Sequence, residues 1–502
     1  MAHTDYHQGS SVRYAWVFIF VCIVLSGFCL RLAWVGLTPL WQDEAETVVY
    51  ALQIEERGYP NGHFQNRPLY ENASYAPSDD PEFAFKSTNY LVSEIERHKG
   101  WAPVYLLAAL RPLWENNVAL TRLPFVAISL GTIIVLFAIG NLMGGVRFGL
   151  GASAFHAFNY FAIFFEHQAR YFAMTSFVFL LFLYLLLRML KGEHNKGHIG
   201  TALIVILLFY THIVYCIVGA LMYIGVLLYF RQTGRAQHAK SWAFSLLLIA
   251  ACTFPWIFIT KAWTMFSEGF ALSIAAKIIW NVLILICMPF IGFVLWTFTR
   301  VKEYPWGTYL VYICVILTVI VTGNIVPGES HNARLYSSLL PLFALLITGS
   351  VIALWRKTSL QTVFVTATIL VIGYFTQIGI GGHPLVGSAL WVRPALAYLE
   401  NHAAGEDIPV FVTFQHFSFW VYAPERDVQL VWPVRKSYFD TYPGRMIFFI
   451  HDDQGPCGWF YLYRRDCLAP PHEEKLSSCT ASVLTSEVTV YDCPARSLTT
   501  SL

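Results

Sequence analysis

Ionisable side chains that could take part in chemistry occur in five short clusters, each next to or within an apolar stretch. The first is an acidic pair, Asp43 and Glu44, which closely follows the first apolar stretch. A carboxylate in such a place can accept a proton as a general base, or it can cap the N-terminus of a helix. The other four clusters all contain His, Lys or Arg and lie at residues 94–99, 166–171, 212 and 331–336.

Each cluster also has an interpretation that involves no chemistry. Asp43 has the position of a helix cap, and residues 94–99 taken alone are a solvated charge run. Arg170 and Glu166 have the i,i+4 spacing of a structural ion pair, although Arg170 could equally bind an anionic headgroup. His212 lies within an apolar stretch, where a histidine is more often a satisfied core residue. No single cluster therefore decides a function.

The composition indicates the surroundings of these clusters. Of the 502 residues, 56% are hydrophobic and 13% are charged, with a formal net charge of +2. A soluble domain has roughly 25% charged residues, so the chain is typical of a polytopic α-helical membrane protein. The same composition excludes a disordered chain, a collagen or a coiled coil. Nucleic-acid binding by bulk charge is excluded as well, because there is no basic excess.

Only a helix or a closed barrel forms all of its backbone hydrogen bonds internally, as a structure surrounded by lipid must. A helix that spans a membrane needs about 20 mostly apolar residues. The candidate spans are residues 14–36, 119–141, 148–166, 171–190, 199–211, 213–230, 242–260, 271–298, 306–323, 336–355 and 360–379. Residues 199–230 fit either one bent helix or two short ones. Residues 101–114 are short and contain Arg111, which favours an interfacial helix.

The loops between the spans are alternately rich and poor in Lys and Arg. Because Lys and Arg are retained in cytoplasmic loops, this alternation predicts about eleven crossings, with the N-terminus in the cytoplasm and the C-terminus outside. All five clusters then lie on the outer face. Acids, Arg, Lys and His gathered on one face favour a phosphate-bearing ligand and a proton acceptor.

Two blocks are predicted outside the membrane. Residues 37–100 form a long first outer loop, helical near 44–57, and belong to a transmembrane module at 1–383. Residues 384–502 form a small extracytoplasmic α/β domain, with a helix near 394–402 and strands at 408–414, 428–434, 446–450 and 488–491. Four cysteines near the end of this domain predict two disulfides in an oxidising compartment: Cys457, Cys467, Cys479 and Cys493.

Several motifs follow one another along about the first 380 residues. They are Leu-Trp-Gln-Asp-Glu-Ala at 40–45, Trp-Ala-Pro at 101–103, Arg-Leu-Pro at 122–124, the run 166–171, Tyr-Thr-His at 210–212, and Arg334, Tyr336 and Pro341. In this order they resemble the polyprenyl-phosphate-sugar-dependent glycosyltransferases of the GT-C fold, particularly the protein mannosyltransferase and lipid A aminoarabinose transferase group. The chain departs from that group at Trp101-Ala102-Pro103, where His-Pro-Pro is usual.

The resemblance implies an inverting glycosyltransferase in the plasma (inner) membrane, with its active site on the outer face. Its donor would be a polyprenyl-phosphate sugar, and its acceptor a hydroxyl of a lipid, glycan or protein. Asp43 and Glu44 would be the catalytic residues, with Asp43 as the general base. The residues that would bind the donor phosphate or substrate are Lys99, Arg122, Glu166, Arg170, Tyr171, His212, His331, Arg334 and Tyr336. No cofactor is required, although a divalent metal is possible at Glu96, His98 and His331.

Two other functions remain open at the level of sequence. A transporter or flippase for a lipid-linked sugar would also carry ionisable residues, but it would place them along a pathway through the membrane. The sequence shows no internal repeat, and most of its ionisable residues fall at one face. A ligase or polymerase with a diphosphate-linked donor is the third possibility, and the early acidic pair disfavours it.

Overall fold

The structure is a computed structural model, and the parts of the chain it describes are residues 10–61, 63–64, 67–68, 95, 100–115, 117–192, 197–233, 239–260, 337–355, 390–412, 416–426, 428–430, 444–451, 476–486 and 488–495. The predicted spans 271–298, 306–323 and 360–379 lie outside these ranges. The chain divides into two compact units, which are described separately. The first is helical and contains the described residues of Met1–Val35, Arg97–Leu106 and Ala119–Gly382.

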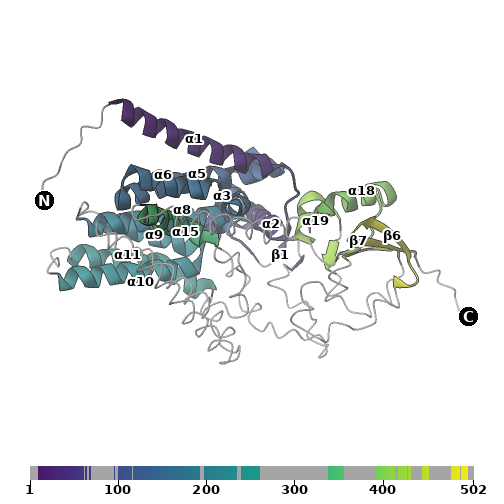
Figure 1. Cartoon of the computed structure of the whole chain (residues 1–502). Helices are drawn as coiled ribbons and strands as arrows, with labels where there is room; N and C mark the ends of the chain where they lie inside the picture. Colours follow the sequence, from purple (N-terminus) through teal and green to yellow (C-terminus); the bar gives the residue numbers. More distant parts are fainter. Residues whose placement is uncertain are drawn as a thin grey trace, which may run out of the picture. The chain divides into compact units, whose positions relative to one another are not determined.

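The helices of the first unit run roughly along a common direction (Figure 1). They are α1 (Ser10–Val35), α5 (Val118–Gly144), α6 (Val146–Ala157), α7 (Tyr160–Glu166), α8 (Tyr171–Leu190), α9 (Gly197–Thr211), α10 (Ile213–Gln232), α11 (Ala239–Thr260) and α15 (Leu340–Trp355), with the start of α3 (Trp101–Ala109). Their buried core is made mainly by α8 and α10, with smaller contributions from α5, α9 and α15. Large apolar side chains on α1 and α11, such as Phe18 and Phe258, are instead exposed, as expected of surfaces that face lipid.

Within the described residues, five helices are long and apolar enough to cross a membrane. The number is six if α6 and α7 together make one span, although these two helices meet at 65°. The sequence predicted one span at 148–166; the structure differs because Asn159 begins a new helix, its side chain accepting a hydrogen bond of 3.0 Å from the N–H of Ala162. Residues 199–230 are likewise two helices, which meet at His212. The total of about eleven crossings stays a prediction.

The second unit contains the described residues of Gly36–Glu96, Leu107–Val118 and His383–Leu502. Its elements are α2 (Gln42–Arg57), β1 (His63–Phe64), β2 (Arg67–Pro68), α4 (Arg111–Trp114), α18 (Val392–His402), β3 (Val410–Val412), α19 (His416–Tyr422), β4 (Val428–Leu430), β5 (Met446–His451), β6 (Thr480–Thr485) and β7 (Val488–Cys493). The predicted helix near 44–57 is therefore present, and each of the four predicted strands has a counterpart among the described strands, in β3, β4, β5 and β7. The helix α19 and the strand β6 were not predicted.

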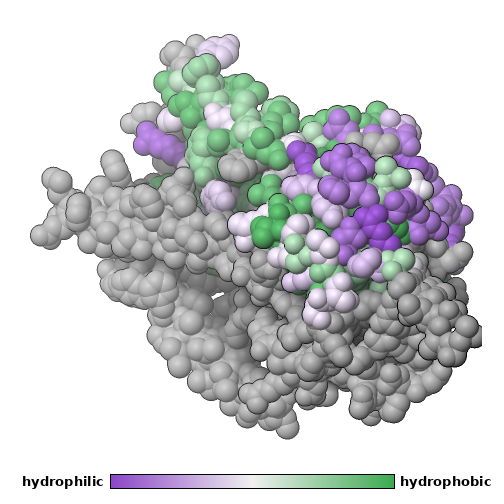
Figure 2. All heavy atoms as spheres, turned by 90° about the vertical axis from the view of Figure 1, so that its right-hand side faces the viewer, coloured by the Kyte–Doolittle hydropathy of each residue, from purple (hydrophilic) through white to green (hydrophobic). Residues whose placement is uncertain are grey.

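The five longer strands of this unit form one mixed sheet in the order β4-β3-β5-β7-β6. Strand β3 is parallel to both β4 and β5, whereas β7 is antiparallel to β5 and β6. Strand β3 is buried throughout, as its apolar sequence requires. Figure 2 looks onto the side where Figure 1 draws α18, β6 and β7, and hydrophilic side chains gather on that face, as expected of a domain in water.

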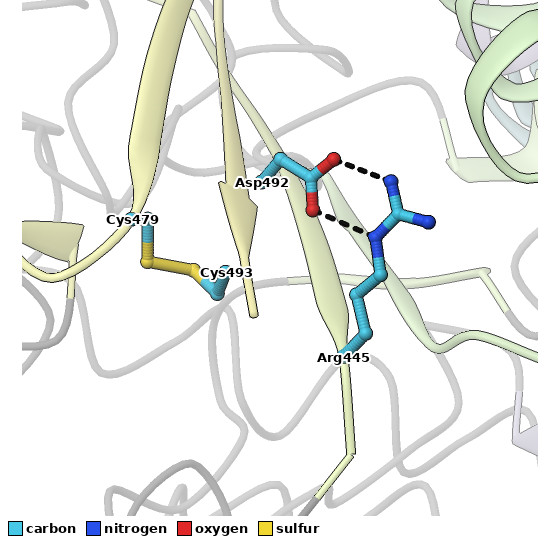
Figure 3. The surroundings of a disulfide bond; sticks show 4 residues. All are labelled: Arg445, Cys479, Asp492 and Cys493. Carbon is cyan, nitrogen blue, oxygen red and sulfur yellow. Dashed lines mark hydrogen bonds and ion pairs between the residues drawn. A yellow bond between two sulfur atoms is a disulfide. The ribbon is translucent and has the colours of Figure 1, made fainter. Parts of the chain in front are cut away.

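One of the two predicted disulfides is present, between Cys479 and Cys493, and it joins the antiparallel pair β6 and β7 (Figure 3). Cys457 and Cys467 are outside the described residues. Next to the disulfide, the guanidinium of Arg445 donates to both carboxylate oxygens of Asp492, at 2.9 and 2.5 Å. These hydrogen bonds hold the pKa of Asp492 below its usual value. The ion pair ties the start of β5 to β7.

Candidate functional site

The acidic pair lies in the first turn of α2, in the second unit. Glu44 is fully buried, and its Oε2 accepts a hydrogen bond of 3.4 Å from the backbone N–H of Trp41, the residue before the helix. The Trp41 carbonyl in turn accepts from the N–H groups of Glu44 and Ala45, at 2.9 Å each. Glu44 therefore caps the helix, the role that one interpretation of the sequence gave to Asp43.

Asp43 differs from Glu44 in its exposure. Its side chain is partly exposed, whereas those of Gln42, Glu44, Ala45 and Glu46 are buried. A carboxylate in the first turn of a helix is stabilised in its ionised form by the helix dipole. An ionised carboxylate that a substrate can reach is suited to accept a proton.

In the helical unit, Glu166 at the end of α7 forms a buried ionic network with two residues that the sequence analysis did not single out. Arg31 of α1 donates to Glu166 Oε2 at 2.9 Å, and Nε2 of His156 from α6 lies 3.0 Å from Oε1. Arg31 also donates to the carbonyls of Gly27 and Ala157, at 3.1 and 3.2 Å. Arg31 and His156 are both fully buried, so the network fastens three helices together at one point.

Arg31 and His156 could have been found in the sequence as lone ionisable residues inside the apolar stretches 14–36 and 148–166. Such residues are costly in a membrane unless they are paired. Both oxygens of the Glu166 carboxylate serve this network. Glu166 thus has a structural ion pair, as one interpretation of the sequence held, although its partner is Arg31.

The residues after Glu166 fold into a buried turn. His167 Nδ1 lies 2.8 Å from the carbonyl oxygen of Ile163, and Gln168 donates its amide to Phe164 O at 3.0 Å. The turn ends at Arg170, which has an extended backbone and is the residue directly before α8. The arginine side chain is only 5% exposed. A buried guanidinium therefore lies at the N-terminus of a helix, where the dipole favours an anion.

Arg170, Tyr171 and His212 lie together. The Arg170 guanidinium carbon is 5.4 Å from the centre of the Tyr171 ring. The centre of the His212 ring is 4.8 Å from the centre of the same Tyr171 ring. His212 is the extended residue between α9 and α10, and its Nδ1 is buried without a hydrogen-bond partner in the part of the chain that the structure describes. Three residues from two sequence motifs thus form one polar group of side chains.

The start of α3 packs against the same end of α9. A Cβ atom at Gly100 would overlap the carbonyl oxygen of Thr211, so only glycine fits there. The Trp101 ring is 5.7 Å from that of Trp256 of α11. These contacts hold the chain at residues 100–101 beside the turn that carries His212.

Arg122 is buried in α5, and its Nη1 donates to the carbonyl of Val35 at 2.8 Å. Val35 is the last residue of α1, so Arg122 neutralises the end of that helix. Other predicted site residues lie outside the described ranges: Glu96, His98, Lys99, His331, Arg334 and Tyr336. Among the described side chains, no three His, Cys, Asp or Glu groups are placed to share a metal ion.

No protein-family profile matches the sequence. Nor does any curated protein. Solved structures do match over nearly the whole chain. The crystal structure of ArnT from Cupriavidus metallidurans bound to undecaprenyl phosphate aligns with a TM-score of 0.55 and 12% identity, covering 95% of this chain and 98% of ArnT. Its apo structure aligns with a TM-score of 0.54 and 14% identity, covering 96% and 98%.

The chain has the GT-C fold. The fold predicted from the motifs is therefore confirmed, and so is the prediction of a membrane protein. At this level of identity the likeness concerns the fold, because one fold hosts many functions. The roles of individual residues depend on the geometry described above.

Proposed function

We propose that this GT-C protein is an inverting glycosyltransferase that moves a sugar from a polyprenyl-phosphate donor to a hydroxyl of a lipid, glycan or protein. It would act at the outer face of the plasma (inner) membrane, with its N-terminus in the cytoplasm. The fold supports this proposal, because ArnT shares it and was crystallised with undecaprenyl phosphate. The ordered sequence motifs support it independently.

The observation that carries the assignment of the base is the difference in exposure between Asp43 and Glu44. Asp43 is partly exposed in the first turn of α2, whereas Glu44 is buried and bonded to the Trp41 N–H. A buried, hydrogen-bonded carboxylate does not reach an acceptor hydroxyl. We therefore assign the general base to Asp43 alone, and we assign Glu44 to holding the start of α2.

In the proposed reaction Asp43 takes the proton of the acceptor hydroxyl. At the same time the oxygen of that hydroxyl forms a bond to the anomeric carbon of the sugar. The bond between that carbon and the phosphate oxygen breaks, and its electron pair stays on the phosphate. A single displacement inverts the anomeric configuration. A phosphate needs no proton to leave at neutral pH, so one base is sufficient.

The leaving phosphate gains negative charge, which a positively charged group should stabilise. Arg170 is suited to this role because its guanidinium and the N–H groups that begin α8 both favour an anion at the same place. Tyr171 and His212 lie beside it and would contact the donor. Lys99, His331, Arg334 and Tyr336 stay proposed members of this site. Glu166 and Arg122 have internal partners, and we assign them to support it.

The proposal is tested by a transfer assay with purified protein in detergent. A radiolabelled polyprenyl-phosphate sugar is offered with separate lipid, glycan and protein fractions of the cell envelope. We expect wild type to move label into one fraction, Asp43→Asn to lose at least about 99% of the rate, and Asp407→Asn, an exposed acid elsewhere in the second unit, to keep it. Glu44→Gln should lose less than Asp43→Asn.

Two results of this assay would contradict the proposal. Transfer by Asp43→Asn at the wild-type rate would show that Asp43 is not the general base. Binding of the donor without any transfer would favour the transporter. We further propose that no cofactor is needed, with a divalent metal at Glu96, His98 and His331 as the alternative. Assays with a chelator, and with Mg²⁺ or Mn²⁺ added back, decide between these two.

A further inference from the structure

The segment that leads into the acidic helix is held by a helix almost 380 residues later in the sequence. The backbone N–H of Leu40 donates to the hydroxyl of Tyr422 at 2.8 Å. The Leu40 carbonyl accepts a hydrogen bond of 2.9 Å from the hydroxyl of Ser418. Both polar groups of one backbone residue, three positions before Asp43, are thus bonded to α19.

The spacing of the two side chains explains how one short helix can do this. Ser418 and Tyr422 are four residues apart, so they lie on the same face of α19, one turn from each other. Leu40 is 2% exposed and precedes the first turn of α2. Its backbone N–H and C=O are therefore shielded from solvent, and buried backbone groups without partners are costly. The two side chains satisfy these groups, and α19 packs along α2 (Figure 1).

The other side of α19 is fastened to the sheet of the same unit. Trp420 donates its indole N–H to the carbonyl of Val428 in β4 at 2.8 Å. The Phe419 ring lies 6.0 Å from that of Phe449 in β5 and 5.6 Å from that of Trp391. The position of Leu40 is therefore set by the sheet through α19.

We propose that Ser418 and Tyr422 are positioning residues for the general base, and that the C-terminal α/β domain acts in the reaction by fixing the start of α2. This inference rests on the proposed role of Asp43. A base must be held within a fraction of an ångström of its proton, and a misplacement of about 1 Å can cost roughly a hundredfold in rate. Glu44 fixes the first turn of α2 through its hydrogen bond with the Trp41 N–H. The helix α19 fixes Leu40, which leads into that turn.

The test compares Tyr422→Phe and Ser418→Ala with wild type in the full-length protein. Tyr398→Phe is the matched control, because it removes a hydroxyl that bonds to Asp492 in the same unit. Ser482→Ala is the control for Ser418→Ala, because Ser482 is exposed on β6. We measure kcat and KM for the polyprenyl-phosphate sugar, and amide hydrogen exchange of the peptide spanning residues 36–46.

We expect kcat to fall roughly tenfold in both variants with KM unchanged, because the base is displaced while donor binding is not. The amides of residues 36–46 should exchange faster, and both controls should behave as wild type. Wild-type exchange in this peptide, or faster exchange with wild-type kcat, overturns the proposal. If Tyr422→Phe does not fold, Ser418→Ala decides alone. An active Asp43→Asn variant overturns the proposed function instead, while exchange still reports whether α19 holds Leu40.

Discussion

At the scale of single residues, neighbouring acids in this chain differ in what they can do. Asp43 and Glu44 are adjacent and chemically alike, yet one is accessible and the other is buried against the Trp41 N–H. The sequence pointed to both as catalytic. Their burial separates the roles, because helical geometry turns adjacent side chains by about 100° to different faces.

The Arg31–Glu166–His156 network buries charged groups inside the helical unit. Removing one partner of a buried ion pair leaves the other charge without compensation. Arg31 Nε and His156 Nδ1 already have no hydrogen-bond partner among the described residues. The network therefore depends closely on the Glu166 carboxylate.

We predict that Glu166→Ala lowers the free energy of unfolding by about 3–5 kcal/mol. The double variant Arg31→Met with Glu166→Leu should be less destabilised than that single variant, because no buried charge is left uncompensated. Thermal unfolding in detergent, followed by circular dichroism, measures both.

The control for this pair is Glu55→Ala, which breaks the half-exposed ion pair between Glu55 and Arg111. Exposed pairs contribute at most about 1 kcal/mol, so this variant should unfold close to wild type. If Glu166→Ala is no less stable than Glu55→Ala, the buried network does not stabilise the helices.

At the scale of elements, breaks between helices place the polar residues. His212 lies where α9 ends and α10 begins, and Arg170 lies where the turn after α7 ends and α8 begins. Both residues have an extended backbone, and each directly precedes the first residue of a helix. The start of α3 is the third element at this end of the unit, and Gly100 allows its approach.

We predict that Gly100→Ala destabilises the protein by roughly 1–3 kcal/mol and reduces transfer, because the new methyl group overlaps the Thr211 carbonyl and pushes α3 away from His212. The matched variant is Gly225→Ala in α10, where nothing lies within 4 Å of an added Cβ. Alanine is the better helix former, so Gly225→Ala should be neutral or slightly stabilising. Melting temperatures and transfer rates of the two variants check this, and equal behaviour would contradict it.

At the scale of the whole molecule, the described chain forms a lipid-adapted helical unit and a second unit with a hydrophilic face (Figure 2). The disulfide between Cys479 and Cys493 is consistent with an oxidising compartment around the second unit. The charge pattern of the loops predicts the same side of the membrane independently.

We predict that an impermeant maleimide labels Ser482→Cys in intact spheroplasts, because this position on β6 is exposed and the loop charges predict that the C-terminal domain lies on the outer side. Gln232→Cys, exposed at the end of α10, should be labelled only after the membrane is opened. The wild-type chain supplies the background from its own cysteines. Labelling of Gln232→Cys in intact spheroplasts would reverse the predicted orientation.

Much of the fold could be predicted because it depends on local patterns. The described spans begin and end within a few residues of the apolar stretches, and the α2 helix and four strands follow from periodicity. The break at Asn159 was missed because hydropathy does not register a single capping residue. The helix α19 was missed because its aromatic sequence, residues 416–422, resembles a strand.

The sequence alone determined that this chain is a GT-C membrane protein with an acidic pair after its first helix, because composition and the order of motifs are properties of the chain itself. Only the tertiary structure decided which residues meet. Arg31 finds Glu166 across 135 positions, and Leu40 finds Ser418 across 378. Contacts at such separations arise from packing, which decides burial and partners, and no local pattern carries that information.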